Sequence, residues 1–167
     1  QREGCRKWVY QTAVGLKKLL AQEDLDAANK ILATLEGDLA GLVKEKGRAE
    51  GNLEKTQRSI VDDQKSKVEA EGESKILETK VESKKQEVVS APSEANTKEL
   101  QALMKEQEKL HKKADKLTES IAAGKRKVED LQFQIKKNLS EQDTKTKAIA
   151  TQKDAVALLT AKLAGIN

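Results

Sequence analysis

Apolar residues recur at alternating spacings of three and four along most of the first half of the chain. The first of two repeating positions falls on Leu25 and returns every seven residues as far as Val88, and the second runs in the same way from Ala28 to Lys84. Most of these positions hold Leu, Ile, Val or Ala. An apolar heptad that keeps its phase over so long a segment predicts a coiled-coil helix.

The second half of the chain repeats this pattern. Its first position runs from Leu100 to Leu163, and its second from Leu103 to Ile166. The seven-residue period indicates a left-handed supercoil. The two apolar stripes are equally long, as a hairpin requires, because each arm can then bury its stripe against the other.

The segment between the two stripes holds the only proline of the chain, Pro92. Proline cannot continue a helix without losing a hydrogen bond, and it disfavours helical angles at Ala91. Asn96 followed by Glu99 has the form of a capping box that starts a new helix, and Ser93 is a second candidate cap. Short connections of this kind join antiparallel helices.

The sequence therefore predicts an all-α fold, a long antiparallel two-helix coiled-coil hairpin over residues 25–167. One arm is expected at residues 25–89, the tip at 90–96 and the second arm at 97–166. The stripes alone leave open an alternative, a parallel dimer of rods that are broken at Pro92.

Pairing of the two stripes favours one register over its neighbour. In the preferred register Val88 faces Leu103 and most layers are apolar, although Lys46 faces Lys145. The neighbouring register, shifted by one heptad, places polar side chains on apolar ones: Lys67 on Leu117, Asp63 on Ile121 and Lys145 on Leu39.

The N-terminal residues carry an apolar stripe, including Trp8 and Leu16, that is out of phase with the heptads that follow. Asp24 is a candidate cap for a fresh helix. We therefore expect residues 1–24 to form a separate short helix, over about residues 5–21, that packs at the open base of the hairpin.

Glycines on outer positions of the first arm fit this arrangement. Each costs about 1 kcal/mol relative to Ala in an exposed helix, yet a small side chain lets another helix approach closely. The expectation is that Trp8 or Tyr10 lies over Gly37 and Gly41. The alternative is that these glycines only make the arm flexible.

Composition narrows the function classes. Charged residues make up 36% of the chain and aromatic residues only 2%, which is typical of long helices rather than of a globular core. The net charge of +4 comes from closely mixed acidic and basic residues, so we expect no specific binding to nucleic acid. The chain begins with Gln1 rather than Met, which suggests a processed form or a fragment, and its compartment stays open.

Few residues are candidates for catalysis or for metal binding. His111 is the only histidine, and Cys5 is the only cysteine, with basic neighbours but no nearby histidine in sequence. No cluster stands at metal-ligand spacing, and no phosphate-binding or nucleophile motif is present. We expect no enzyme activity, no catalytic residue, no cofactor and no metal site.

The segment from Asp62 to Ser74 is the weakest part of the first stripe. Phe133 occupies an outer position close to the expected facing segment. Three interpretations remain open: a bend of the hairpin, a site where a further chain completes the core, or simply imperfect packing in a long rod.

The most favoured function is a structural spacer or stalk that presents its tip and helical faces to unidentified protein partners, with a homo-oligomer as one form. Candidate protein-binding residues are Ser90, Pro92, Ser93, Glu94 and Asn96 at the tip, with Trp8, Tyr10 and Phe133 elsewhere. The alternative is binding to a membrane or lipid surface through amphipathic helices. The narrow stripe and scarce aromatics argue against it.

Overall fold

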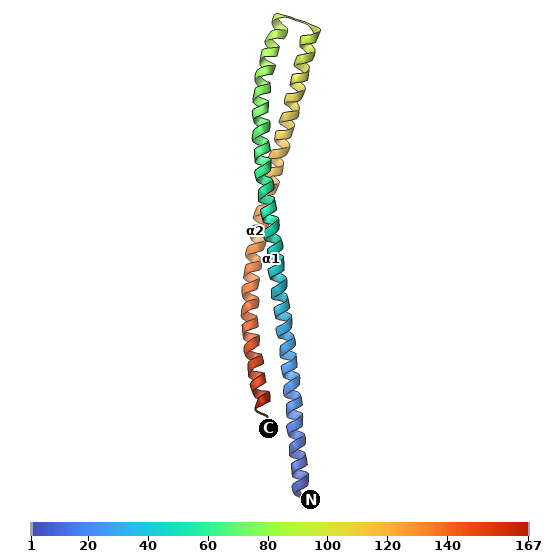
Figure 1. The fold of residues 1–167 in the computed structure, drawn as a ribbon, viewed down its shortest axis with the longest axis vertical. Helices are drawn as coiled ribbons and strands as arrows, with labels where there is room; N and C mark the ends of the chain where they lie inside the picture. The colour runs from blue at the N-terminus through green and yellow to red at the C-terminus, as the bar shows by residue number, and fades with distance from the viewer. Residues whose placement is uncertain (1, 167) are drawn as a thin grey trace. The chain divides into compact units, whose positions relative to one another are not determined.

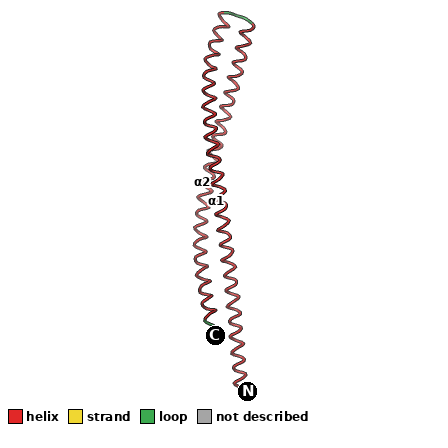
Figure 2. The backbone as a smooth tube through the Cα atoms, viewed as in Figure 1, coloured by secondary structure: helices red, strands yellow, loops and turns green. Residues whose placement is uncertain are grey.

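The structure, a computed structural model, describes residues 2–166 and is almost entirely helical (Figures 1 and 2). Helix α1 spans Arg2–Ser90 and helix α2 spans Glu94–Ala164, and the described residues contain no strand. The two helices pack against each other, which confirms the prediction of an all-helical chain built from two long helices. Positions 1 and 167, at the outer limits of the two predicted segments, lie outside the described residues.

The contacts divide the chain into two units. Unit 1 pairs the part of α1 up to Arg48 with the part of α2 from Gln134 onward. Unit 2, Ala49–Phe133, contains the rest of both helices and the turn that joins them. Hydrogen bonds join the two helices in both units: from Ser120 to Asp63 in unit 2, and from Asn138 to the Leu42 carbonyl and from Gln152 to the Ala28 carbonyl in unit 1.

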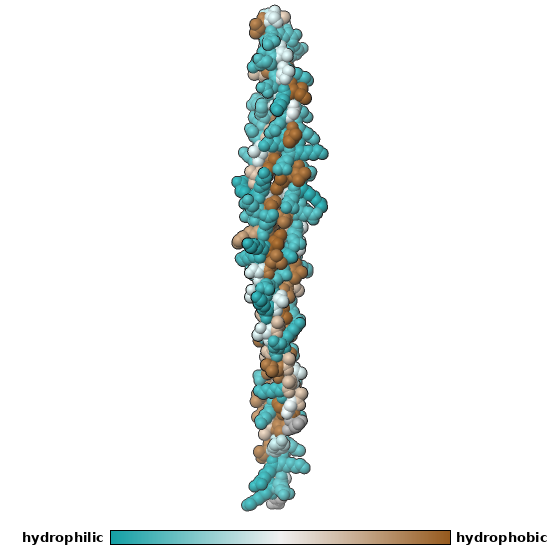
Figure 3. All heavy atoms as spheres, turned by 90° about the vertical axis from the view of Figure 1, so that its left-hand side faces the viewer, coloured by the Kyte–Doolittle hydropathy of each residue, from teal (hydrophilic) through white to brown (hydrophobic). Residues whose placement is uncertain are grey.

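Unit 2 buries small and medium apolar side chains between its two helices. Its most buried residue is Ala70, whose exposed fraction is 2%, and Leu77, Val81, Ile121 and Leu131 are also buried. In the view of Figure 3, hydrophobic residues form a broken line, with hydrophilic side chains on either side of it. Burial of the apolar stripe is the main contribution that holds such a helix pair together.

Unit 1 combines apolar burial with polar contacts across the seam. Ala21, Ala28 and Ile149 are buried, and so is Asn138. The side-chain amide of Asn138 donates a hydrogen bond to the Leu42 carbonyl at 2.9 Å. A buried polar group must find such a partner, so this contact restricts how the two helices can slide along each other.

The register in unit 2 differs from the preferred one by one heptad. A Cβ atom built on Gly124 would lie 2.8 Å from Cγ1 of Ile60, so these two residues face each other. The Ser120 hydroxyl donates a hydrogen bond to Asp63 at 2.7 Å, in the same register. The expected pairing of Val88 with Leu103 is therefore wrong.

The length of the turn explains the register. Helix α1 ends at Ser90 and α2 begins at Glu94, so the two ends are equally distant from Pro92. Ile60 and Gly124 are also equally distant from Pro92. A short connection centred on the proline requires this pairing, whereas the preferred register needs a longer turn centred near Asn96.

Lys145 is accommodated in the observed register, although it lies in a layer of the apolar seam. Lys145 crosses its layer in unit 1, and its ammonium group binds Asp38 at 3.1 Å, with the side chain only 34% exposed. The predicted layer of Lys46 facing Lys145 would instead have placed two like charges together. Long side chains bury their apolar stems and keep the charge at the surface. A lysine in the seam therefore destabilises the helix pair less than the sequence pattern implies.

The separate N-terminal helix is not formed. Helix α1 runs without interruption from Arg2 through Asp24 to Ser90, because no proline or glycine interrupts residues 16–36. Trp8 is 68% exposed, and no atom lies within 4 Å of a Cβ built on Gly37 or Gly41. The expected packing of Trp8 or Tyr10 over these glycines is therefore wrong.

Candidate protein-interaction site

The tip forms because α1 stops before Pro92. The last turn of α1 closes with a hydrogen bond from the Ala91 N–H to the Glu87 carbonyl at 2.8 Å. The Ser90 hydroxyl donates to the Gln86 carbonyl at 2.9 Å. The Ala91 N–H thus satisfies the Glu87 carbonyl, which is one of the last four carbonyl groups of the helix and has no partner within it.

Ser93 starts α2. Its hydroxyl oxygen accepts a hydrogen bond from the Asn96 N–H at 3.1 Å, and its carbonyl accepts from the Thr97 N–H at 3.1 Å. This is the geometry of an N-cap, in which a side-chain oxygen satisfies a free N–H of the first turn. Of the two candidate caps, Ser93 takes this role and Asn96 does not.

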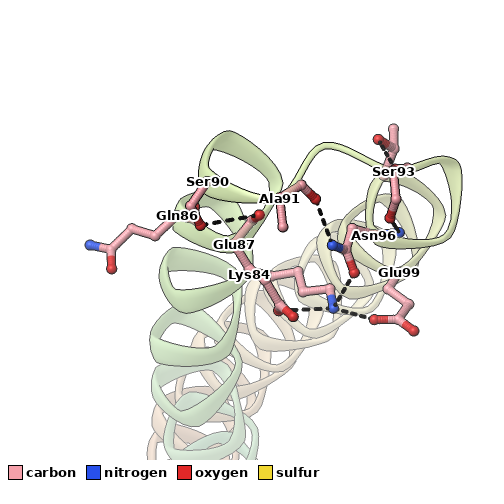
Figure 4. Close-up of polar contacts among 9 residues, drawn as sticks. Lys84, Gln86, Glu87, Ser90, Ala91, Ser93, Asn96 and Glu99 are labelled. Carbon is pink, nitrogen blue, oxygen red and sulfur yellow. Dashed lines mark hydrogen bonds and ion pairs between the residues drawn. The ribbon is translucent and has the colours of Figure 1, made fainter.

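Asn96 and Lys84 tie the two helix ends together (Figure 4). The Asn96 amide donates to the Ala91 carbonyl at 2.9 Å, and its oxygen accepts a hydrogen bond from the Lys84 ammonium at 3.2 Å. Lys84 also binds Glu99 on α2 and Glu87 on its own helix. Hydrogen bonds to Glu99 and then to Glu87 raise the pKa of Lys84 above its ordinary value of 10.5.

The sequence pattern did not single out Lys84 as a functional residue. It occupies the last position of the second heptad series of the first arm, four residues before Val88, and its side chain is only 13% exposed. A lysine in the apolar seam close to the turn, opposite a segment that contains Glu99, could have indicated an ion pair between the two helices. The structure thus adds a positioning residue beneath the tip.

The predicted tip residues share one turn and differ in exposure. Ser90, Pro92, Ser93 and Glu94 are exposed, whereas Asn96 is half-buried by its contacts. Val89, which the sequence pattern did not single out, is 81% exposed next to them. We call the set of Val89, Ser90, Pro92, Ser93 and Glu94 the tip surface.

The three aromatic candidates do not join the tip surface. Phe133 is 69% exposed and lies at the end of unit 2 that is remote from the turn. Trp8 and Tyr10, which are 68% and 65% exposed, belong to unit 1.

In unit 1, α1 continues past the end of α2 (Figure 1). Residues 2–20 of α1, which we call the N-terminal overhang, are exposed except for half-buried Val14. Ala21 is the first buried residue of the helix. The overhang therefore presents side chains that α2 does not cover.

Titratable and nucleophilic groups are dispersed. Cys5 and His111 are exposed. Across residues 2–166, no group of three His, Cys, Asp or Glu side chains is arranged to hold a metal ion. Within that range, neither helix has a stretch apolar enough to cross a membrane.

Comparison with models of known protein families, with curated proteins and with solved structures finds no match to this chain.

Proposed function

We propose that this chain is an antiparallel coiled-coil hairpin that acts as a non-enzymatic spacer or stalk and presents its tip and outer helical faces to partner proteins. The seam between the helices is occupied by packed apolar residues and by polar residues that bind across it, such as Asn138. Surfaces for recognition therefore lie on the outside. Each unit contains a stretch of α1 that rises about 60 to 70 Å along its axis, which suits a spacer.

The observation that supports an interaction role most directly is the construction of the tip. Lys84 and Asn96 hold the ends of both helices in one arrangement. The Glu94 side chain is 88% exposed and lies 3.9 Å from the Lys98 ammonium group on the same helix. A turn that is ordered in advance loses little conformational entropy on binding. The tip surface thus offers one apolar side chain, hydroxyl groups and a carboxylate on a fixed frame.

Site-specific photo-crosslinking in the cells that produce the protein tests this role. A benzophenone side chain at Ser90 reports on the tip surface, and the same group at Glu119, an exposed position of α2 in unit 2, is the matched control. We expect one discrete adduct from Ser90, its loss in the Glu94→Lys variant, and no such adduct from Glu119. Equal adducts from both positions, or an adduct that Glu94→Lys leaves unchanged, would contradict the proposal.

Lipid binding is a second candidate because of the N-terminal overhang. Trp8, Val9 and Leu16 are exposed there, together with the basic residues Arg6 and Lys17. An amphipathic helix of this kind can lie in a membrane interface. Flotation with anionic vesicles at low salt decides this: wild-type protein that floats, and a Trp8→Ser variant that does not, would support lipid binding. A wild-type protein that stays in the bottom fraction would exclude it.

A further inference from the structure

The N-terminal overhang carries a second apolar seam on its outer face. Val9, Ala13, Leu16 and Leu20 follow one another at spacings of four, three and four, which places them on one side of the helix. The side of α1 that packs on α2 is marked by other residues, since Val14 is half-buried and Ala21 is buried. The outer seam therefore faces away from the side on which α2 packs.

The outer seam is exposed to solvent. Val9, Leu16 and Leu20 are each between 53% and 58% exposed, and Leu19 lies on the adjoining face of the helix. The three seam side chains leave on the order of 300 Å² accessible, of which most is apolar. A helix of this length is marginal by itself in water and gains its stability from packing of an apolar face.

We propose that the outer seams of two copies of this chain pair antiparallel, as a symmetric dimer with its two-fold axis beside Val14 and Gly15. In this arrangement Val9 packs against Leu20 of the second copy, and Ala13 packs against Leu16 of the second copy. Both contacts occur twice, because a two-fold interface uses the same surface on both subunits. All four apolar positions of the seam thus find an apolar partner.

Charge selects the antiparallel orientation. Arg6 and Glu23 extend the outer seam at its two ends, with the same helical spacing, and both are exposed. The antiparallel pairing places Arg6 next to Glu23 of the second copy at each end. A parallel pairing would place Arg6 on Arg6 and Glu23 on Glu23, and like charges at these positions repel.

The size of the seam sets the expected affinity. Two copies would bury about 600 Å² from the seam side chains and up to about 1,000 Å² in total with the flanking side chains, which is at the small end of specific interfaces. We expect a dissociation constant on the order of 10 to 100 µM, so the dimer forms at high local concentration, for example when chains are gathered in an assembly. The dimer and the spacer role are tested separately. A spacer that is strictly monomeric would show no dimer in the test below and would still give the adduct at the tip.

Sedimentation equilibrium and a spin label on Cys5, the only cysteine, test the dimer and its orientation together. The antiparallel pairing offsets the two Cys5 residues along the axis, and the expected distance between them is about 30 Å. A parallel pairing gives about 10 Å between the same residues. A dimer with the longer distance supports the proposal, and a dimer with the shorter distance overturns it.

Charge exchange supplies the matched control. Arg6→Glu and Glu23→Arg, each alone, should weaken dimerisation at least tenfold, and the double variant should restore it, because both ion pairs are then reversed. Leu16→Glu should abolish the dimer, whereas Leu158→Glu, the same change at an exposed position of α2, should leave it intact. A wild-type chain that stays monomeric at millimolar concentration, or one that is monomeric in solution and binds anionic vesicles through the overhang, would overturn the proposal.

Discussion

Replacement of Gly124 by Ala tests the helix pairing in unit 2 through a single added carbon atom. The new Cβ would lie 2.8 Å from Cγ1 and 3.2 Å from Cδ1 of Ile60. Carbon atoms in contact are normally separated by about 3.5 to 4.0 Å, so Ile60 or the helices must shift. In the register that the sequence pattern favoured, position 124 faces Lys67 and the added methyl group meets no such obstacle.

Two opposing effects set the magnitude. Ala has a better helix propensity than Gly by about 1 kcal/mol, which favours the variant. Overpacking of a fitted core costs about 1 to 3 kcal/mol, which disfavours it. We expect Gly124→Ala to lower the free energy of unfolding by up to about 2 kcal/mol, which corresponds to a decrease in Tm of several degrees for a chain of this size.

Two further variants isolate the contact with Ile60. Gly72→Ala is the matched control, because a Cβ built on Gly72 meets no atom within 4 Å, and this change should stabilise the chain by about 1 kcal/mol. When Ile60→Ala removes the obstructing atoms, Gly124→Ala should also become stabilising. The two positions should therefore show a coupling energy of about 2 kcal/mol in a double-mutant cycle.

The assay is urea unfolding followed by circular dichroism at constant protein concentration. The reasoning is refuted if Gly124→Ala stabilises the protein as much as Gly72→Ala does, with no coupling to Ile60.

Three other changes probe the tip, the buried polar layer and the ion pair. Ser93→Ala removes the N-cap of α2 and should lower the free energy of unfolding by about 1 kcal/mol in urea titrations; an unchanged midpoint would show that the cap is not used. Asn138→Leu should raise that free energy by about 1 kcal/mol and, at the same time, permit mixed helix registers in disulfide mapping, because a buried polar group trades stability for a unique pairing. Glu99→Gln should lower Tm at neutral pH by weakening the contact with Lys84. Since the pKa of Lys84 is raised in the folded state, this difference should be complete below about pH 10.5 and disappear as the pH rises above it, whereas a difference that persists at high pH would exclude the ion pair as its cause.

The heptad pattern was sufficient for the architecture but not for the register. Two long helices on either side of Pro92 followed from periodicity and from the chemistry of proline. The pattern misleads on the register because it counts Lys145 as a polar residue in an apolar layer, whereas the Lys145 stem spans the layer and its ammonium group reaches Asp38. Contacts such as that from Gln152 to the Ala28 carbonyl use backbone acceptors, which a side-chain pattern does not reveal.

The N-terminal stripe is visible in the sequence, but it does not mark a separate helix. The change of phase after Leu20 neither ends a helix nor starts another at Asp24. A helix backbone continues through such a change, since only the face that carries apolar residues moves around the axis. The structure shows one helix, α1, with an inner face toward α2 and an exposed outer face in the overhang.

The tip was partly predictable. The break at Pro92 and the capping role of Ser93 follow from residue chemistry close in sequence. The contacts of Lys84 with Asn96 and Glu99 required knowledge of which layers face each other, and that information depends on the register. An error of one heptad therefore hid the residue that holds the turn.

Intramolecular disulfide formation tests reversal of the chain at Pro92 most directly. In a Cys5→Ser background, Ala70→Cys combined with Ala114→Cys should form a disulfide within one molecule, because the observed register places these two positions face to face. The comparison pair, Ala70→Cys with Ile121→Cys, is separated by one heptad and should remain reduced in the monomer. Closure of the second pair in preference to the first, or cross-links found only between two molecules, would contradict the fold described above.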